Sequence, residues 1–184
     1  MIQAGKSRRE LAELHPKAII QFGNGIKRWK EDLKPDVPLY SIKHIEYHYG
    51  PPGIGKSSKT SEIVPRPFVK DCDTKWWDNY DGEQCVQLDD FPGKMDCITA
   101  KKWLGEVNVP LEIKCGVTEM RYTRVYITSN LAPEECFQNA QEAHRAAFLR
   151  RIKDVYSYSW IDSTPTDEER ATGIRFPVRI VKIR

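Results

Sequence analysis

The fold prediction for this chain starts from one stretch, Gly50-Pro51-Pro52-Gly53-Ile54-Gly55-Lys56-Ser57. It matches the pattern G-x-x-x-x-G-K-[ST] and directly follows the apolar run 41–49, SIKHIEYHY, which has the composition of a buried strand. Glycines at these spacings let backbone N–H groups turn inward around phosphate oxygens, and the following helix presents its positive N-terminus to the same anion. We therefore predict a nucleotide-binding loop over residues 50–57, with Ser58 beside it.

Two side chains of this loop have specific expected roles. Lys56 would neutralise the β- and γ-phosphates of a nucleotide, and the hydroxyl of Ser57 would ligate Mg²⁺. A glycine-proline turn that resembles the loop by chance is the alternative, but Lys-Ser directly after the last glycine is a demanding match.

A second strand, VQLDD at 86–90, ends in two adjacent acids. Asp89 would help to hold Mg²⁺, while Asp90 would orient and polarise an attacking water. The alternative is an ordinary strand-end turn with solvated aspartates. The loop at 50–57 favours the catalytic interpretation.

Two further segments supply candidate residues. The run 124–130, RVYITSN, places Asn130 at the expected nucleotide edge of the sheet, where an amide can sense the γ-phosphate; capping of the next helix by Ser129 or Asn130 is the alternative. Arg150 and Arg151 end a helical pattern at 134–151, and a solvated helix end is the alternative for both.

The composition is that of a globular protein. The chain has 184 residues, 40% hydrophobic and 30% charged, with a net charge of 29 minus 26, or +3. No window approaches the ~20 apolar residues of a membrane span, so we expect a soluble intracellular protein with no membrane partner. Its five cysteines are odd in number and form no C-x-x-C pair, which argues against zinc and disulfides and favours reduced thiols.

The chain divides into two predicted domains, 1–36 and 37–184. Residues 7–34 have helical periodicity, with an apolar stripe at Phe22, Ile26, Trp29 and Leu33 and a break at His15-Pro16. KPDVP at 34–38 is the expected linker. Beyond it, strand-like runs at 41–49, 84–91 and 124–130 alternate with helical patterns at 99–107 and 134–151, which predicts an α/β sheet domain.

The order GPPGIGKS, VQLDDF, VYITSN and LRRI resembles the superfamily three helicase domain of viral replication initiators. KWWDNYDGEQCVQLDDF at 75–91 and the HP pattern at His15 resemble the circovirus type of Rep protein. The resemblance implies a P-loop NTPase with an AAA+-like sheet, preceded by a small helical oligomerisation domain. It makes residues 50–57 the Walker A loop, Asp89 and Asp90 the Walker B acids and Asn130 the sensor. An arginine finger is expected at Arg151, which precedes Ile152, or at Arg150.

The resemblance also implies a DNA-contacting hairpin, which LEIKCGV at 111–117 would form. Lys114 is its expected phosphate contact, helped by Arg121 or Arg124 on the returning strand. Complete Rep proteins also have a nicking domain with a His-hydrophobic-His metal site. The spacing of His44 and His48 is similar, but both lie in a predicted strand, so we do not interpret them as that site and expect a fragment of a longer protein. Trp76 and Trp77 are expected to pack.

The resulting hypothesis is an ATP-driven, Mg²⁺-dependent DNA helicase motor. By family resemblance it would form a homo-oligomeric ring, a hexamer, travel 3′ to 5′ on single-stranded DNA, and work in the host nucleus. A small P-loop kinase would share residues 50–57 but needs an acceptor pocket. The third hypothesis is a non-catalytic module that binds nucleotide only to close a ring.

Overall fold

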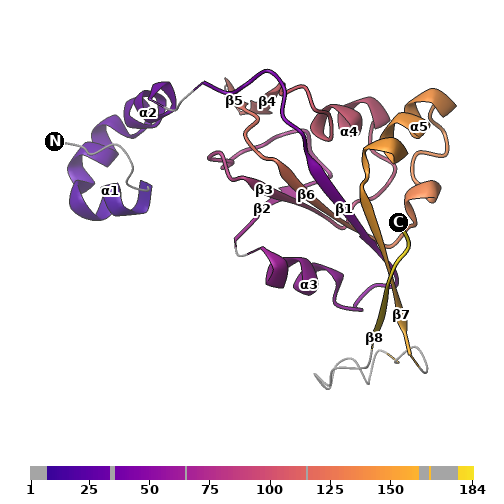
Figure 1. Cartoon of the computed structure of the whole chain (residues 1–184). Helices are drawn as coiled ribbons and strands as arrows, with labels where there is room; N and C mark the ends of the chain where they lie inside the picture. Colours follow the sequence, from indigo (N-terminus) through magenta and orange to yellow (C-terminus); the bar gives the residue numbers. More distant parts are fainter. Residues whose placement is uncertain (1–7, 34–35, 65, 115, 162–165, 167–177) are drawn as a thin grey trace. The chain divides into compact units, whose positions relative to one another are not determined.

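The computed structural model describes residues 8–33, 36–64, 66–114, 116–161, 166 and 178–184. The chain divides into two compact units, Met1–Asp36 and Val37–Arg184 (Figure 1). Among the described residues, no helix combines the length and the apolar character that a bilayer crossing requires.

The first unit contains two helices, α1 (Arg8–Leu14) and α2 (Pro16–Asp32), which confirms the predicted break at His15-Pro16. Pro16 takes the first position of α2, where its missing N–H costs nothing. The helix kinks at Phe22, whose backbone is not helical, and the aromatic side chain of Phe22 is 58% exposed. Trp29 and Leu33 are also exposed, whereas Ile26 is half-buried, so three of the four residues of the predicted apolar stripe face solvent among the described residues. The predicted linker lies partly outside the described residues, at 34 and 35.

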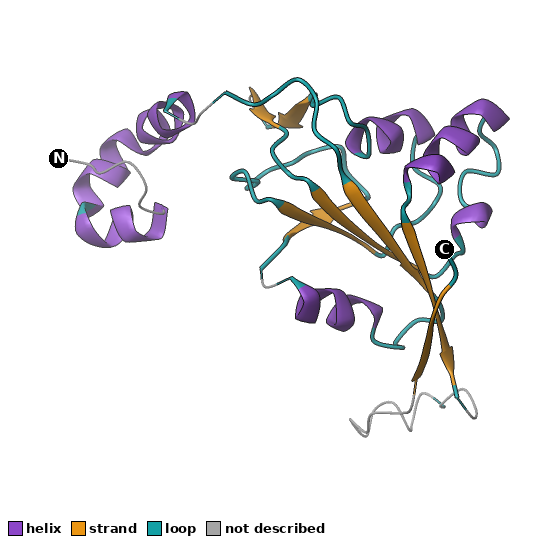
Figure 2. Cartoon of the chain, in the orientation of Figure 1, coloured by secondary structure: helices purple, strands orange, loops and turns teal. Residues whose placement is uncertain are grey.

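The second unit is a mixed α/β fold around a six-stranded sheet (Figure 2). The strands are β1 (His44–Tyr49), β2 (Phe68–Asp71), β3 (Cys85–Asp89), β6 (Arg124–Ser129), β7 (Asp154–Trp160) and β8 (Val178–Lys182). Their order is β2-β3-β6-β1-β7-β8, with β8 antiparallel to β7 and every other neighbouring pair parallel. The predicted α/β class and the strands within 41–49, 84–91 and 124–130 are confirmed.

Helices cover both faces of this sheet. Helix α3 (Lys56–Ile63) lies on one face, while α4 (Cys97–Trp103) and α5 (Glu142–Arg151) lie together on the other (Figure 1). Ile45, Val86 and Leu88 are part of the buried core with Phe148 of α5. The strand β6 is placed between β1 and β3, so the three strands that carry the predicted motifs are adjacent.

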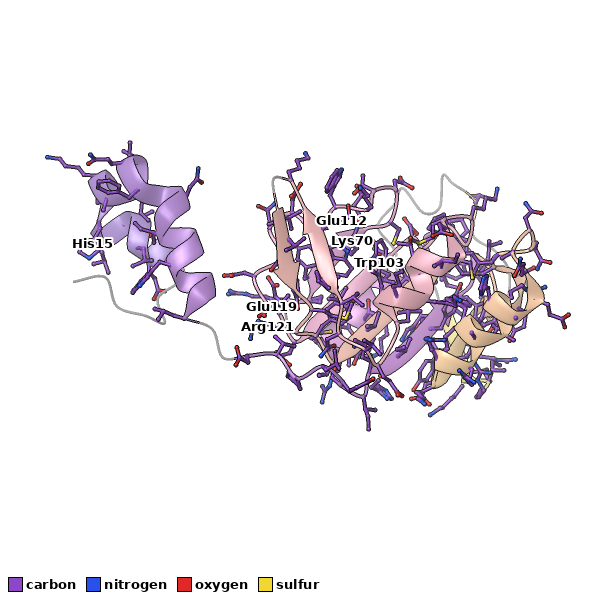
Figure 3. The ribbon with its side chains drawn as sticks, turned by 90° about the horizontal axis from the view of Figure 1, so that it is seen from above. His15, Lys70, Trp103, Glu112, Glu119 and Arg121 are labelled. Atoms are coloured by element: carbon purple, nitrogen blue, oxygen red, sulfur yellow. The ribbon has the colours of Figure 1, made fainter. Side chains whose placement is uncertain are left out.

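An aromatic cluster fills one end of the core. The ring of Trp77 is fully buried and stacks on Tyr122, with 5.4 Å between centroids. Lys70, also buried, lies with its ammonium 4.8 Å from the ring centroid of Trp103 (Figure 3). The expected packing role of Trp77 is confirmed, whereas Trp76 is half-buried beside Lys75.

The helical segment predicted at 134–151 is wrong in its first half. Residues Pro133–Glu135 form a single 3₁₀ turn, and α5 begins only at Glu142. Between them Phe137 has a φ of 57° and donates its N–H to the Gly93 carbonyl at 2.7 Å, with its ring against Phe148. Burial of that ring overrides local helical periodicity.

The helix predicted at 99–107 runs instead from Cys97 to Trp103. Asp96 sets its start, because the carboxylate accepts the N–H groups of Ile98 and Thr99 at 3.2 and 2.9 Å.

Candidate functional site

The loop at 50–57 connects the carboxyl end of β1 to α3, as predicted. Gly50 has a φ of 151°, and a Cβ there would collide with the Tyr158 backbone carbonyl, so only glycine fits. Gly55, at a φ of 93°, is the N-cap of α3, and a Cβ there would meet nothing within 4 Å. The backbone therefore curves around an open position at the helix N-terminus, where a phosphate group fits.

Lys56 bridges the loop to Asn130, the residue that follows β6 (Arg124–Ser129). Its Nζ donates to the carbonyls of Gly50 and Pro51 at 2.8 and 2.9 Å and to Oδ1 of Asn130 at 3.0 Å. The side chain is only 5% exposed. Burial lowers the pKa of Lys56, and the charges of Asp90 and Asp89 partly oppose that shift. The structure thus brings together Lys56 and Asn130, 74 residues apart in the chain.

Asp89 accepts three side-chain hydrogen bonds at a single oxygen. Ser57 Oγ donates to Asp89 Oδ1 at 2.6 Å, Thr128 Oγ1 at 2.7 Å and Gln87 Nε2 at 3.0 Å. Burial alone would raise the pKa of this carboxyl, but the hydrogen bonds hold it below its ordinary value, so Asp89 is an anion at neutral pH. A hydroxyl and a carboxylate this close form the hard oxygen pair that Mg²⁺ prefers. The residues present therefore fit the predicted metal.

Asp90 has a different environment from its neighbour. Its φ is 46°, in the left-handed region that aspartate tolerates better than most residues, and its N–H donates to Thr128 Oγ1 at 3.1 Å. Its side chain is exposed at the edge of the sheet.

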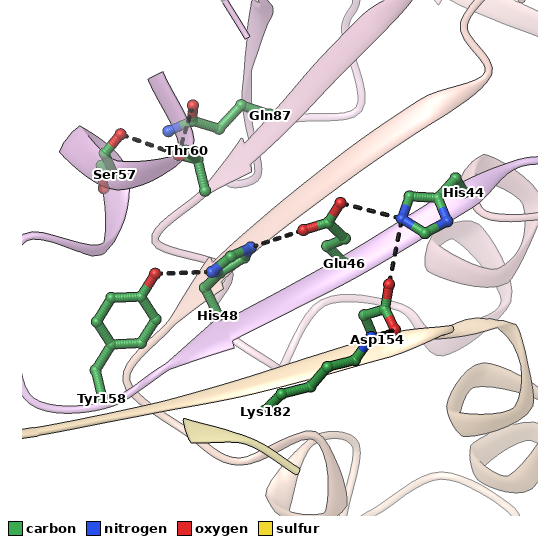
Figure 4. A network of polar contacts seen from close by, with 9 residues as sticks. All are labelled: His44, Glu46, His48, Ser57, Thr60, Gln87, Asp154, Tyr158 and Lys182. Atoms are coloured by element: carbon green, nitrogen blue, oxygen red, sulfur yellow. Dashed lines mark hydrogen bonds and ion pairs between the residues drawn. The ribbon is translucent and has the colours of Figure 1, made fainter. Parts of the chain in front are cut away.

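Sequence reasoning missed the polar residues that support Asp89. Gln87 lies two positions before Asp89 in β3, so strand alternation puts both side chains on one face of the sheet. Thr128 lies two positions before Asn130 and donates to Asp89 from the neighbouring strand β6. Thr60 of α3 donates to Gln87 Oε1 at 3.1 Å, tying the helix to β3 (Figure 4). A spacing of two residues from the predicted Asp89 and Asn130 was the signal that would have found Gln87 and Thr128.

Arg150 and Arg151 lie in the last turn of α5, and Arg151 Nη1 donates to the Ala147 carbonyl at 2.6 Å. Both line a pocket of about 640 Å³ that also includes Ile45 at the start of β1. At about 3.3 Å per residue, Ile45 is about 16 Å from the loop at the other end of that strand. The structure therefore does not bring these arginines to the loop of their own chain. The pocket is strongly basic; its other charged residues are Lys43, Lys101, Lys102, Glu106 and Lys153.

The predicted hairpin is present as β4 (Pro110–Ile113) and β5 (Gly116–Glu119), which are antiparallel. Lys114, at the turn, has a side chain that is 73% exposed and lies 3.7 Å from Asp78 Oδ2. The placement of Arg121 and Arg124 on the returning strand is wrong, because β5 ends at Glu119. Arg121 is ion-paired with Glu119 (Figure 3), and Arg124 begins β6 in the main sheet.

Comparison with known proteins agrees with this geometry. A family model described as RNA helicase matches residues 47–131, which include the loop, Asp89 and Asn130. The replication-associated protein of human associated cyclovirus 1 is 31% identical over 160 residues, covering 83% of this chain and 56% of that protein. The corresponding proteins of beak and feather disease virus and porcine circovirus 2 are 28% and 27% identical, each covering 86% of this chain and 53% and 51% of their own lengths.

The chain spans about half the length of the curated relatives it matches. A mostly parallel sheet with the loop between β1 and α3 is the arrangement of a P-loop NTPase-like helicase domain. Fold, motif order and relatives thus agree, and they confirm the resemblance that the sequence suggested. This chain belongs to the circovirus-like replication-associated (Rep) proteins and corresponds to their helicase domain.

Proposed function

We propose that this chain is the ATP-hydrolysing motor of a viral replication initiator and that it moves along single-stranded DNA. One observation carries the proposal: Lys56, Asp89 and Asn130, from three separate segments, meet at one edge of the sheet through hydrogen bonds to the loop or to each other. A loop that merely resembled a nucleotide site would not require a buried lysine, an ionised carboxylate and an amide to converge there.

Each residue has a role that its position supports. Backbone N–H groups of residues 50–57 and of Ser58 would surround the phosphates, and Lys56 would exchange its carbonyl partners for phosphate oxygens. Ser57 and Asp89 would hold Mg²⁺, which supplies charge neutralisation at the β- and γ-phosphates. Asp90 would orient the attacking water and accept its proton as the bond to the γ-phosphorus forms, and Asn130 would bind the γ-phosphate.

Assembly is the second part of the proposal. The sheet order, with β6 between β1 and β3, supports an AAA+-like subunit. The exposed apolar side chains of Phe22, Trp29 and Leu33 support an oligomerisation role for residues 1–36, because covering such surface with another copy of the chain is favourable. In a ring, taken to be a hexamer from the family resemblance, Arg151 or Arg150 would reach the nucleotide of the neighbouring subunit.

Contact with DNA is assigned to Lys114, whose exposed ammonium at the hairpin turn suits a phosphate. Travel from 3′ to 5′ and action in the host nucleus follow from the family resemblance and are proposed on that basis alone.

The test is steady-state phosphate release by the purified chain, with ATP and Mg²⁺, in the presence and absence of single-stranded DNA. Release that DNA stimulates, and that Asp90→Asn removes, supports the motor. Release that requires a small hydroxyl acceptor instead would identify a kinase. Nucleotide binding without any release would leave a ring-closing module and overturn the proposal.

A further inference from the structure

A second group of metal-ligating side chains lies on the sheet face that carries α3, away from the nucleotide edge. His44, Glu46 and His48 alternate along β1 and therefore share that face. Asp154 of β7 pairs in register with Glu46 and joins them from the neighbouring strand (Figure 4). His44 precedes Gly50 by six residues, so it is about 20 Å from the loop along the strand. The proposed Mg²⁺ ligands Ser57 and Asp89 belong to the opposite edge.

The donor atoms are spaced as ligands of one ion. His44 Nε2 lies 3.0 Å from Glu46 Oε1 and 3.3 Å from Asp154 Oδ2, and the ligand atoms of the three residues all lie within 4.8 Å of one another. Ligand atoms about 2.1 Å from a tetrahedral zinc ion are about 3.4 Å apart. Only small rotations of the side chains would close the group around an ion, and His44, 47% exposed, leaves a path from solvent.

Neighbouring groups fix these ligands and add an independent sign of a site. His48 is 2% exposed, and its Nδ1 lies 2.9 Å from the Tyr158 hydroxyl. Its Nε2 forms no hydrogen bond within the described part of the chain and lies 3.5 Å from Glu46 Oε2. A buried nitrogen aimed at a ligand carboxylate is the outer contact that metal sites use to orient their ligands. On the other side, Lys182 Nζ lies 2.5 Å from Asp154 Oδ1 and leaves Oδ2 facing His44.

We propose that His44, Glu46 and Asp154 bind one divalent transition-metal ion of the Zn²⁺ class, with His48 as a positioning residue behind Glu46. A mixed set of imidazole and carboxylate ligands suits such ions better than it suits Mg²⁺ or Ca²⁺, which prefer oxygen alone. Two carboxylates with one neighbouring lysine leave a net negative charge, which attracts a cation. The bound ion joins β1 to β7 and stabilises the strand that leads into the nucleotide loop.

The experiment uses the full chain, stripped with EDTA and free of nucleotide and Mg²⁺. Zn²⁺ is titrated by calorimetry, and Co²⁺ is used as a visible-absorption probe, because thiolate ligation would add an intense near-ultraviolet band that nitrogen and oxygen ligands lack. We expect one equivalent to bind without that band and to raise the melting temperature as its concentration rises. Asp154→Asn and His44→Gln should each weaken binding by at least ~10-fold.

Two control variants separate this site from others. Lys182→Met removes the ion pair to Asp154 but keeps the carboxylate, so binding should be retained or strengthened. Asp89→Asn alters the proposed Mg²⁺ site and should leave the affinity for Zn²⁺ unchanged. The proposal is overturned if no equivalent binds, if the thiolate band appears, or if Asp154→Asn binds like the wild type while melting normally in EDTA. If Asp89→Asn loses Zn²⁺ binding instead, the ion binds at the proposed nucleotide site and not at His44, Glu46 and Asp154.

Discussion

Asp89 and Asp90 are adjacent in the chain, but their different environments suit them to different roles. Asp89 is held by Ser57, Thr128 and Gln87, while the Asp90 side chain is exposed and its backbone is left-handed. A held anion suits a metal ligand, and an exposed carboxylate can reach a water molecule. This difference is the basis for separating binding from hydrolysis by mutation.

Asp90→Asn should leave ATP affinity within about threefold of the wild type while reducing turnover by ~10²-fold or more, because it removes only the proton acceptor. Lys56→Ala should lose both affinity and turnover. It should also unfold more easily, by about 1–3 kcal/mol, since Lys56 is buried with three oxygen partners. Nucleotide titration, phosphate release and urea unfolding measure the three quantities. Equal loss of ATP affinity in both variants would contradict the assignment.

Lys43 predicts a pH dependence of stability. Burial lowers its pKa to about 8, and the charge of Glu106 only partly opposes this. Between pH 8 and about 10.5 the unfolded chain holds a proton on Lys43 that the folded chain has released, so stability rises with pH across that window. Relative to Lys43→Met, the free energy of unfolding of the wild type should rise by about 2 kcal/mol, measured by urea denaturation. If the free energy of unfolding changes with pH in the same way for the wild type and Lys43→Met, the prediction is wrong. Lys94→Met, at an exposed lysine, is the control.

At the scale of elements, β4 and β5 form a hairpin that projects one exposed lysine at its turn. Lys114→Ala should weaken binding of single-stranded DNA about equally for all sequences and make the slope of log affinity against log salt shallower by about 0.7. The basal ATPase should persist. Fluorescence anisotropy over a salt series measures both effects, with Lys94→Ala as an exposed control. An unchanged slope would move the DNA contact elsewhere.

Local patterns predicted the elements that carry strong signals. Apolar runs before the glycine loop, before Asp89 and before Asn130 identified β1, β3 and β6, and a proline identified the break before α2. Parallel strands that end in polar residues made the convergence of the site foreseeable. The helix boundary at 142 was not foreseeable, because it depends on where Phe137 buries its ring, which is a tertiary contact. Likewise, the basic pocket around Arg150 depends on how α4, α5 and the start of β1 pack.

At the scale of the whole molecule, the nucleotide loop and the two arginines of α5 lie at opposite ends of the sheet. An active site that needs both must take them from two copies of the chain. Arg151→Ala alone should lose ~10³-fold in turnover, and Lys56→Ala alone should be equally inactive. Premixed, the two variants should regain a minority of the wild-type rate, because an intact loop meets an intact arginine at some interfaces.

The mixing experiment measures phosphate release under conditions where ring formation is verified by light scattering. The same experiment is done with Arg150→Ala in place of Arg151→Ala. The arginine whose substitution removes activity alone, and whose variant regains activity when mixed with Lys56→Ala, is the finger. Mixed rings without any recovered activity would argue against a finger contributed by either arginine across the interface.

The two ends of the glycine loop are anchored unequally. β1 is hydrogen-bonded on both sides, to β6 and β7, while α3 buries only Lys56 and Thr60. By amide hydrogen exchange we therefore expect residues 44–49 to open only with the whole domain and residues 56–63 to open on their own. ATP should therefore slow exchange in α3 and leave β1 unchanged, so the loop reports the nucleotide through the helix that follows it.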